Sequence, residues 1–504
     1  MKKILSVFSA VALLMSTTAC EDFFDINQDP NAPAAENITA SMIFPATEMA
    51  AAVSYGDYLR IVGGYYSQIY AHQFGTSNYL DYSQFEMSAT RSSGTYSQFF
   101  QKGLTNLKTV QEKATASEDW GTYLAATTIR AFIYQALVDC YGEVPYTEAL
   151  DDANLTPKYD DGKDIYLGIL GELDEALAKV SPADLVCTNF LFPGKPASEW
   201  IKFANSLKLR ILVRMMDSVD VKAKLDALVA ENNFITSDVE VAGCWEQAAG
   251  KESPFYGEEF STLGGSTQVN IIANAAIINS MQVRNSEGDI IYTDPRLPVF
   301  FSSNNEGKYD GGVSGTNFST AAAPYNSTGH WCRPVASFDM PVSFLSLAEV
   351  KFFLAEYAAK YGIGDAAAYY AEAIEASFAS AGVAGAAEYI ALNPYKASNY
   401  KESIGVAKWI ALAGVNPFEA YCELRRLKYP AFETSISGSD LYVDGGAADT
   451  SKLPAYKLYT PIKVFGQVGP NALLQRFPYA ESSDTPNANC PEFPGYSVPI
   501  FWAK

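Results

Sequence analysis

The sequence predicts a mainly α-helical protein, with a scaffold of tetratricopeptide-like helix pairs, long irregular loop-rich insertions and little β structure. Apolar residues recur at spacings of three and four in several long segments, which is the period of an amphipathic helix. Small Ala residues and a Gly-containing break join two of these segments into a helical hairpin. Stretches rich in Gly, Ser, Asn and Pro near 251–343 and 430–504 interrupt the helical pattern and predict the insertions.

The N-terminus has the pattern of a lipoprotein signal peptide over residues 1–19. Lys2 and Lys3 precede an apolar run, and small residues then lead to Cys20. The run is shorter than the roughly 20 residues that a membrane-spanning helix needs. An ordinary signal peptidase would also accept the small residues, but a Cys directly after them favours attachment of lipid to Cys20. We therefore expect removal of 1–19 and a lipid-anchored mature chain, 20–504, that forms one domain.

Three segments in the first half show apolar stripes with the helical period, at 129–140, 169–180 and 200–215. A fourth pattern runs from 347 to 378 and is broken in the middle by a Gly-Ile-Gly turn, which predicts the tetratricopeptide-like hairpin. A further helix is expected to begin at 416–419, where Asn can cap it, Pro takes the first helical position and Glu the third.

The charge and cysteine content narrow the class of protein. The formal net charge is −21, which excludes nucleic acid as a partner because phosphate backbones require a basic face. Six of the seven cysteines remain when Cys20 carries lipid, and they are widely dispersed. Because a large core does not need disulfides, we expect mostly unpaired cysteines, with Cys140 as a buried free thiol in an apolar stripe.

A search for catalytic and metal-binding motifs finds none. His72 and His330 are the only histidines, and neither lies at a metal-ligand spacing. The sequence has no CxxC, HExxH or GxSxG motif. We therefore predict no catalytic residue, no metal and no cofactor. A paired-carboxylate glycosidase stays open, since such carboxylates converge in space without a fixed sequence spacing.

Aromatic residues are concentrated between 65 and 85, interleaved with amide and carboxyl side chains. Such a surface packs rings on the apolar face of a sugar or peptide side chain while polar neighbours hydrogen-bond it. We interpret the apolar residues of 65–70 as the core stripe of a helix that begins near Asp57. Tyr79 and Tyr82 fit core packing and ligand contact equally well. Trp331 is either a stacking platform or a ring that packs its loop onto the core.

Several segments, in their order and spacing, resemble the SusD/RagB family of nutrient-binding outer-membrane lipoproteins. The matching segments are Cys20-Glu21-Asp22-Phe23-Phe24, Asp29-Pro30-Asn31, Tyr141-Gly142-Glu143-Val144-Pro145, Trp200-Ile201-Lys202-Phe203-Ala204-Asn205, Asp294-Pro295-Arg296, Glu423-Leu424-Arg425-Arg426 and Arg476-Phe477-Pro478-Tyr479. The resemblance covers nearly the whole mature chain.

The resemblance implies four tetratricopeptide-like helix pairs and a loop-rich side that faces the ligand. It also implies a protein on the cell surface that captures an oligosaccharide or peptide and acts as a lid on a SusC-like TonB-dependent transporter. Family members take their ligand contacts from the loop after the first helix and from the middle insertion. In this chain those regions contain Asn78, Tyr79, Tyr82, Arg91, Tyr325 and Trp331.

Capture alone requires no catalysis, so we predict a binding protein rather than an enzyme. Two alternatives make different structural predictions. A surface glycosidase or peptidase would place two carboxylates about 5 to 9 Å apart in a cleft. A scaffold for a partner protein would show an exposed apolar groove on its helices and no aromatic loop site.

Overall fold

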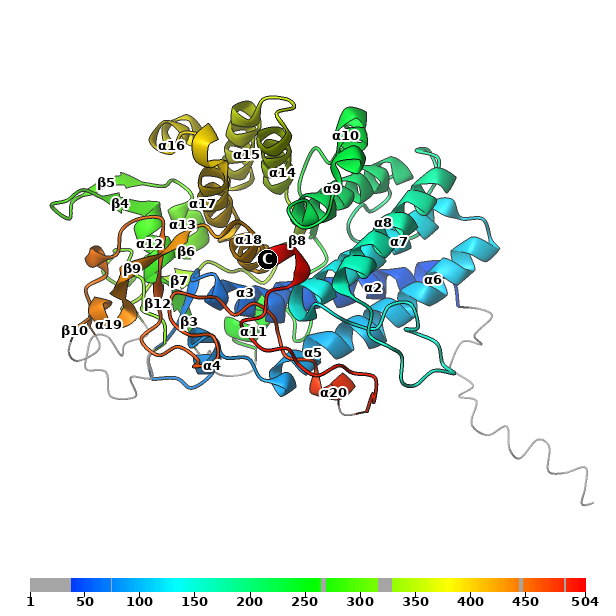
Figure 1. Ribbon diagram of the computed structural model, residues 1–504, viewed down its shortest axis with the longest axis horizontal. Helices are drawn as coiled ribbons and strands as arrows, with labels where there is room; N and C mark the ends of the chain where they lie inside the picture. The colour runs from blue at the N-terminus through cyan, green and yellow to red at the C-terminus, as the bar shows by residue number, and fades with distance from the viewer. Residues whose placement is uncertain (1–37, 74, 264–268, 316–328, 444–446, 485) are drawn as a thin grey trace, which may run out of the picture.

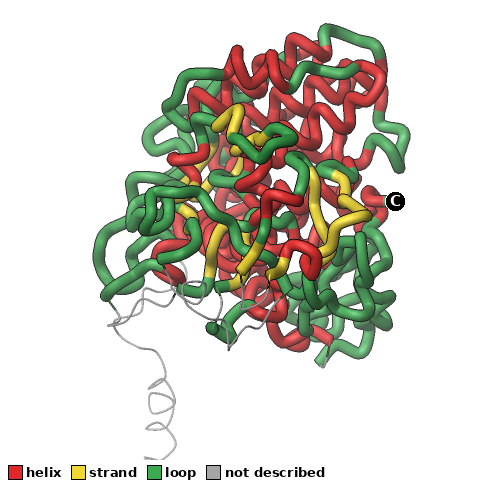
Figure 2. The backbone as a smooth tube through the Cα atoms, turned by 90° about the vertical axis from the view of Figure 1, so that its left-hand side faces the viewer, coloured by secondary structure: helices red, strands yellow, loops and turns green. Residues whose placement is uncertain are grey.

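The computed structural model describes residues 38–73, 75–263, 269–315, 329–443, 447–484 and 486–504. The predicted signal peptide, Cys20 and Tyr325 lie outside the described residues. Helices dominate and the strands are short, so the predicted mainly α fold with little β structure is confirmed. In Figure 1 long helices occupy the top and right, while most strands lie at the left. Figure 2 turns that left side toward the viewer and shows loops and strands gathered there in front of the helices.

The N-terminal helices continue into one another through π-helical turns. They are α2 (Ala40–Ser54), η3 (Tyr55–Leu59) and α3 (Arg60–Tyr66), followed after a loop by α5 (Ala89–Ser97), η4 (Gln98–Leu104) and α6 (Thr105–Ala116). The helix predicted to begin near Asp57 therefore begins at Ala40. It ends before Ile69 and Tyr70, because Gln68 adopts a positive φ of 54° that no helix can continue. The predicted burial of the 65–70 stripe is confirmed.

The three predicted apolar stripes of the first half lie on long helices and are confirmed. These helices and the shorter one that follows are α7 (Trp120–Tyr141), α8 (Gly162–Lys179), α9 (Ala197–Met215) and α10 (Lys222–Glu231). Helix α7 packs against α6, α8 and α9, so it is buried along nearly its whole length rather than on one face. Helix α8 keeps one polar face in solvent, which matches its strict three-four spacing.

A second group of helices follows the middle insertion. It comprises α14 (Leu347–Tyr361), α15 (Ala366–Ser380), α16 (Ala386–Leu392), α17 (Tyr400–Leu412) and α18 (Pro417–Leu427). The hairpin of α14 and α15 is confirmed. Gly362 ends α14 with a φ of +68°, and the Asp365 carboxylate caps α15. Asn416 caps α18 by accepting from the Glu419 amide, as its sequence predicts.

The remaining elements are short and belong mainly to the insertions. Within the described ranges the strands form six two-stranded sheets, and β9–β12 is the one parallel pair among them. The strands are β1 (Tyr70–His72), β2 (Val239–Val241), β3 (Ile271–Ala273), β4 (Gln282–Arg284), β5 (Ile290–Thr293), β6 (Phe301–Ser302), β7 (Arg333–Pro334), β8 (Val342–Leu345), β9 (Ala431–Ser437), β10 (Tyr442–Val443), β11 (Ala447–Ala448) and β12 (Lys457–Thr460). The short helices are α4 (Leu80–Ser83), α11 (Pro254–Glu259), α12 (Ala275–Met281), α13 (Leu297–Phe300), η5 (Ala397–Asn399), α19 (Gly438–Leu441), η7 (Thr450–Lys452), α20 (Glu481–Asp484) and η8 (Phe501–Ala503).

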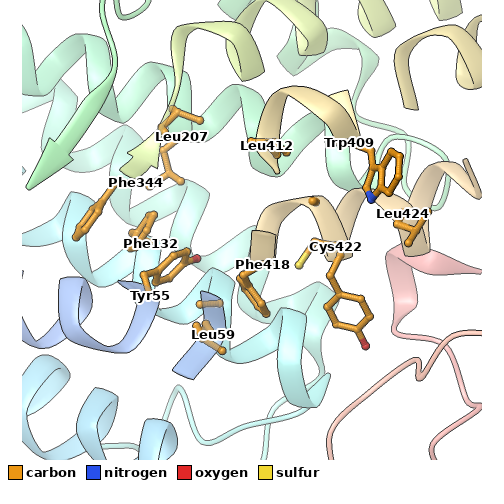
Figure 3. Close-up of a cluster of buried hydrophobic side chains, with 14 of the residues drawn as sticks. Tyr55, Leu59, Phe132, Leu207, Phe344, Trp409, Leu412, Phe418, Cys422 and Leu424 are labelled. Atoms are coloured by element: carbon orange, nitrogen blue, oxygen red, sulfur yellow. The ribbon is translucent and has the colours of Figure 1, made fainter. Parts of the chain in front are cut away.

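The core joins the two helical groups (Figure 3). Phe132 of α7 stacks on Phe344 of β8 with ring centroids 4.4 Å apart, and Tyr55 of η3 lies 4.4 Å from Phe132. Phe418 of α18 meets the Tyr55 ring edge-on at 5.7 Å. Aromatic contacts of this kind stabilise a core by about 1 kcal/mol each beyond their buried area. They hold the scaffold rigid beneath the insertions.

One further prediction is tested by the described residues. Cys140 is a buried free thiol, as expected, and Cys332 and Cys422 are also buried free thiols. Burial raises the pKa of the Cys422 thiol well above its ordinary value. Among the helices of the described ranges, none combines the length and apolar character needed to cross a bilayer.

Candidate ligand-binding site

A two-stranded sheet brings together the regions in which the sequence predicts ligand contacts. His72 of β1 lies opposite Ile271 of β3 in an antiparallel pair. The loop that follows β1 therefore starts where the segment before β3 ends, and the Gln73 amide donates to the Asn270 carbonyl at 2.9 Å. The Ala273 amide donates to the Cys332 carbonyl at 2.8 Å, which adds the segment next to Trp331. Three loops that are distant in sequence are thus held together by the β1–β3 sheet.

Tyr79 and Tyr82 stack on each other, but they lie in the core. Their ring centroids are 5.6 Å apart with an interplanar angle of 12°. Tyr79 is 5% exposed and Tyr82 is 1% exposed, so the Tyr82 ring has no free face for a ligand. Tyr65 packs beside both rings. The core interpretation of Tyr82 therefore fits the structure better than the ligand interpretation, which stays a prediction.

Arg91 and Asn78 lie at the outer edge of this tyrosine cluster. The Arg91 guanidinium covers the Tyr82 ring at 5.3 Å from its centroid and pairs with Asp81 at 3.3 Å. The Arg91 side chain is 40% exposed, and Asn78 is half-buried. Both can reach a molecule that lies over the loop. Their predicted ligand contact is untested and stays a prediction.

Trp331 is 3% exposed and meets the half-buried His330 ring edge-on at 4.5 Å. Burial lowers the pKa of His330 below its ordinary value, which favours the neutral imidazole. A ring this deeply buried packs the loop onto the body of the protein and offers little surface for stacking. Tyr325, the other candidate of this insertion, lies outside the described residues.

An aromatic pair that the sequence did not predict lies on α11 and its C-cap residue. The Tyr256 and Phe260 rings stack with centroids 6.2 Å apart and an interplanar angle of 16°, and both residues are half-buried. The Arg333 guanidinium lies 4.5 Å from the Phe260 centroid. A Tyr and a Phe four residues apart within a Gly-rich insertion is the signal that could have indicated this pair, because that spacing aligns side chains on a helix.

Polar groups beside this pair lack partners. Arg333 Nε and Nη2 are buried and have no hydrogen-bond acceptor within the described part of the chain, and Asn270 Oδ1 has no donor there. A buried polar group without a partner costs about 1 to 3 kcal/mol. A ligand that accepts from Arg333 and donates to Asn270 would offset that cost.

Carboxylates complete the site. The Tyr79 hydroxyl donates to Glu258 Oε1 at 2.9 Å, and Asn270 Nδ2 donates to Glu259 Oε1 at 3.2 Å. Burial raises the pKa of Glu259 to about 7, and burial with the nearby charges of Glu258 and Glu259 raises the pKa of Asp57 to about 7. Near neutral pH these carboxyl groups therefore both donate and accept hydrogen bonds, which suits a polyhydroxylated ligand.

Comparisons with known proteins identify the family and the fold. Residues 30–442 match the SusD-like family described as starch-binding and associating with the outer membrane. A SusD homologue from Bacteroides uniformis superposes with a TM-score of 0.74 at 21% identity, covering 92% of this chain and 99% of that chain. A chitin-binding SusD homologue from Flavobacterium johnsoniae superposes with a TM-score of 0.67 at 18% identity, covering 92% and 96%.

Another structure, described as a chitin-binding protein, superposes with a TM-score of 0.70 at 19% identity, covering 92% of this chain and all of that one. No curated protein sequence matches the chain at a significant level. The structural similarities establish the tetratricopeptide-like helical fold, and the match over residues 30–442 establishes the family. The chain belongs to the SusD-like family of glycan-binding, outer-membrane-associated proteins.

Proposed function

We propose that this protein captures oligosaccharides at the cell surface and delivers them to a SusC-like TonB-dependent transporter without cleaving them. The observation that carries the proposal is the half-buried Tyr256 and Phe260 pair beside the unpartnered donors of Arg333. One side of a sugar ring is apolar and stacks on aromatic faces, while its hydroxyl groups satisfy polar neighbours. The site offers both kinds of contact within one loop cluster.

The descriptions of the family and of two structural relatives favour a glycan over a peptide as the ligand. The family is described as starch-binding, and two of the structural relatives are described as chitin-binding. A peptide would also stack on rings, but it has fewer hydroxyl groups to pair with the protonatable carboxyl groups of Asp57 and Glu259. Each aromatic contact is worth about 1 kcal/mol, so single-site affinity is modest and longer glycans gain by contacting several sites.

In this proposal some of the predicted ligand residues contact the glycan and others position or support the residues that do. Asn78 and Arg91 form the outer rim and contact the ligand directly. Tyr79 orients Glu258 through its hydroxyl group. Tyr82 and Trp331 support the loops from below, and Tyr325 belongs to the same middle insertion.

The anchoring and the transporter partner belong to the proposal as well. Lipid on Cys20 would tether the described body through residues 21–37, and the family's association with the outer membrane supports this placement. A tethered lid needs no membrane-spanning helix of its own. The loop-rich side would then face the transporter lumen and hold the glycan between the two proteins.

A glycan array tests the proposal, using the full chain purified in detergent. Phe260→Ala and Arg333→Gln are expected to lose about tenfold in affinity for the glycan that the wild type binds, because they remove the stacking face and the donors. Tyr369→Ala removes a half-buried ring from α15, away from the site, and serves as the matched control. Wild-type binding by both site variants would exclude this site.

The same experiment separates binding from hydrolysis. Recovered glycan is analysed by mass spectrometry after prolonged incubation at pH 5 and pH 7. Intact glycan is expected at both values. Shortened products that disappear in an Asp57→Asn or Glu259→Gln variant would support the glycosidase alternative and overturn the proposed non-enzymatic role.

A further inference from the structure

A separate cavity of about 550 Å³ lies between the sheet of β2 and β8 and the helices α14, α15 and α17. Hydroxyl groups are concentrated in its lining, which includes Ser237, Ser337, Ser343, Ser346, Ser377 and Ser380. Apolar side chains complete the lining, among them Val299, Phe300, Val335 and Met340. Its size is within the range of small-molecule sites, and none of its lining residues belongs to the proposed glycan site.

The only charges in the lining of this cavity are negative. Asp238 and Glu240 line it, and no Lys, Arg or His does, all of its lining residues being described. Asp238 is already engaged, because its carboxylate accepts from the Leu347 amide at 2.7 Å and from the Ser380 hydroxyl at 2.6 Å. Glu240 is half-buried, and no hydrogen bond or ion pair within the described ranges engages its carboxylate. Burial and the nearby Asp238 charge raise its pKa.

A second unsatisfied group lies next to Glu240. Ser343 is its direct partner across the antiparallel β2–β8 pair, so both side chains project from the same face of the sheet. The Ser343 residue is 6% exposed, and its hydroxyl group has no hydrogen-bond partner within the described part of the chain. Side chains directly opposite across strands lie about 5 Å apart at their Cβ atoms. The cavity lining therefore includes a carboxylate and an orphan hydroxyl group, side by side on one face of the sheet, that one ligand atom could contact together.

The apolar part of the lining would contact an apolar body. Val299 and Val335 are 38% and 43% exposed, which is unusual for side chains of their size. Phe300 is mostly buried, and a Cβ on Gly414 would come within 2.2 Å of its ring. The close approach of the turn between α17 and α18 to this ring keeps Phe300 in place. A cavity lined by both polar and apolar groups selects an amphiphilic molecule.

We propose that this cavity binds a small organic cation, a primary ammonium on a compact apolar body, through Glu240 and Ser343. An ammonium has three donors, of which one would pair with the Glu240 carboxylate and another with the Ser343 hydroxyl oxygen. An anion would be repelled by two carboxylates with no compensating positive charge. A neutral alcohol of the same shape would leave the partly desolvated Glu240 charge uncompensated.

Three probes with one shared body test this inference on the full chain. They are cyclohexylmethylamine, cyclohexylmethanol and cyclohexanecarboxylate, titrated by isothermal calorimetry at pH 7. The amine is expected to bind about tenfold more tightly than the alcohol, because its ammonium adds charge attraction to the hydrogen bond that either probe can donate to Glu240. The carboxylate is expected to show no binding. Equal binding of all three, or binding of none, would overturn the proposal.

Substitutions at Glu240 test whether the preference for the amine arises in this cavity. Glu240→Gln keeps the shape and is expected to abolish the preference for the amine, while Glu240→Lys is expected to reverse it in favour of the carboxylate. Glu375→Gln removes an exposed carboxylate from α15 outside the cavity and should leave the preference unchanged. Thermal unfolding confirms that each variant is folded. An amine preference that survives Glu240→Gln, or that Glu375→Gln also removes, would place the cation elsewhere and refute the assignment.

Discussion

The Arg426 guanidinium donates to both carboxylate oxygens of Glu356, at 2.7 Å and 2.8 Å, although both side chains are buried. This pair joins α18 to α14. Glu423 accepts from the same guanidinium and from Lys408 Nζ of α17, the latter at 2.8 Å. The Glu-Leu-Arg-Arg segment that contributes to the family resemblance therefore ties three helices together inside the scaffold.

We predict that Arg426→Met lowers the free energy of unfolding by about 3 to 5 kcal/mol, because it removes both hydrogen bonds from the buried Glu356 carboxylate and leaves it only the longer contact with Lys408 at 3.9 Å. Urea unfolding followed by circular dichroism measures the change. Adding Glu356→Met is expected to recover part of the loss, since the double variant buries no unpaired carboxylate at that position. Arg284→Met, on the half-exposed β4, is the control and should change stability by less than about 0.5 kcal/mol. A loss of the same small size for Arg426→Met would contradict the prediction.

Helix α3 crosses α18 closely at Gly63. A Cβ at this position would lie 2.4 Å from Phe418 Cα and 2.7 Å from the Pro417 carbonyl oxygen, and backbone atoms cannot move aside as side chains do. We predict that Gly63→Ala destabilises the fold by more than about 2 kcal/mol through overpacking. Gly94 of α5 has nothing within 4 Å of the corresponding Cβ position, so Gly94→Ala should stabilise by about 0.5 to 1 kcal/mol. If both substitutions changed the free energy of unfolding in the same direction, the close crossing of α3 and α18 at Gly63 would be excluded.

The helical scaffold is predictable from sequence because the residues that determine each helix lie within that helix or directly beside it in the chain. The stripes at 129–140 and 200–215 and the capping residues at 362 and 416 each determine structure within a few positions. The π-helical turns at Tyr55–Leu59 and Gln98–Leu104 have no such pattern, so the sequence analysis did not find them. Turn η4 packs against α2, and turn η3 contacts α11, β8 and α18, so both turns lie at contacts that exist only in the folded chain.

The site is predictable by region but not by residue. The β1–β3 pair joins segments about 200 positions apart through three residues each, and strands this short have no clear sequence signal. Whether a tyrosine is core or surface then depends on what covers it. Tyr82 is covered by Arg91 and Tyr65, whereas Tyr256 is left half-buried. No periodicity distinguishes these two cases.

Asp57 should make stability depend on pH in a direction opposite to that of an ordinary ion-paired carboxylate. Burial raises its pKa from 3.8 to about 7, so the folded state keeps a proton that the unfolded state has lost. The free energy of unfolding therefore falls as pH rises from about 4 to 7. Asp57→Asn cannot titrate and should reduce this fall by roughly 3 kcal/mol, with the other raised carboxyl groups accounting for the rest. Urea unfolding at several pH values measures the slope.

Asp152→Asn provides the comparison for Asp57, because Asp152 is exposed in a loop and the substitution removes the same charge. This variant is expected to keep the pH slope of the wild type. If Asp57→Asn also kept the full slope, the carboxyl group of Asp57 would have an ordinary pKa in the folded protein, and its role as a protonated donor in the glycan site would fail with it.

Tyr79→Phe isolates the contribution of one hydrogen bond to glycan binding. The substitution keeps the ring stacked on Tyr82 but removes the hydroxyl group that donates to Glu258 at 2.9 Å. Without this bond the Glu258 carboxylate is free to turn toward solvent and away from the neighbouring ring pair. We predict about fivefold weaker binding of the array-selected glycan, measured by calorimetry, which corresponds to about 1 kcal/mol. Tyr357→Phe removes an equivalent tyrosine-to-carboxylate bond, to Asp226 at 2.7 Å on the helical scaffold, and should leave affinity unchanged. Equal affinities for wild type and Tyr79→Phe would show that the tyrosine acts on the fold alone.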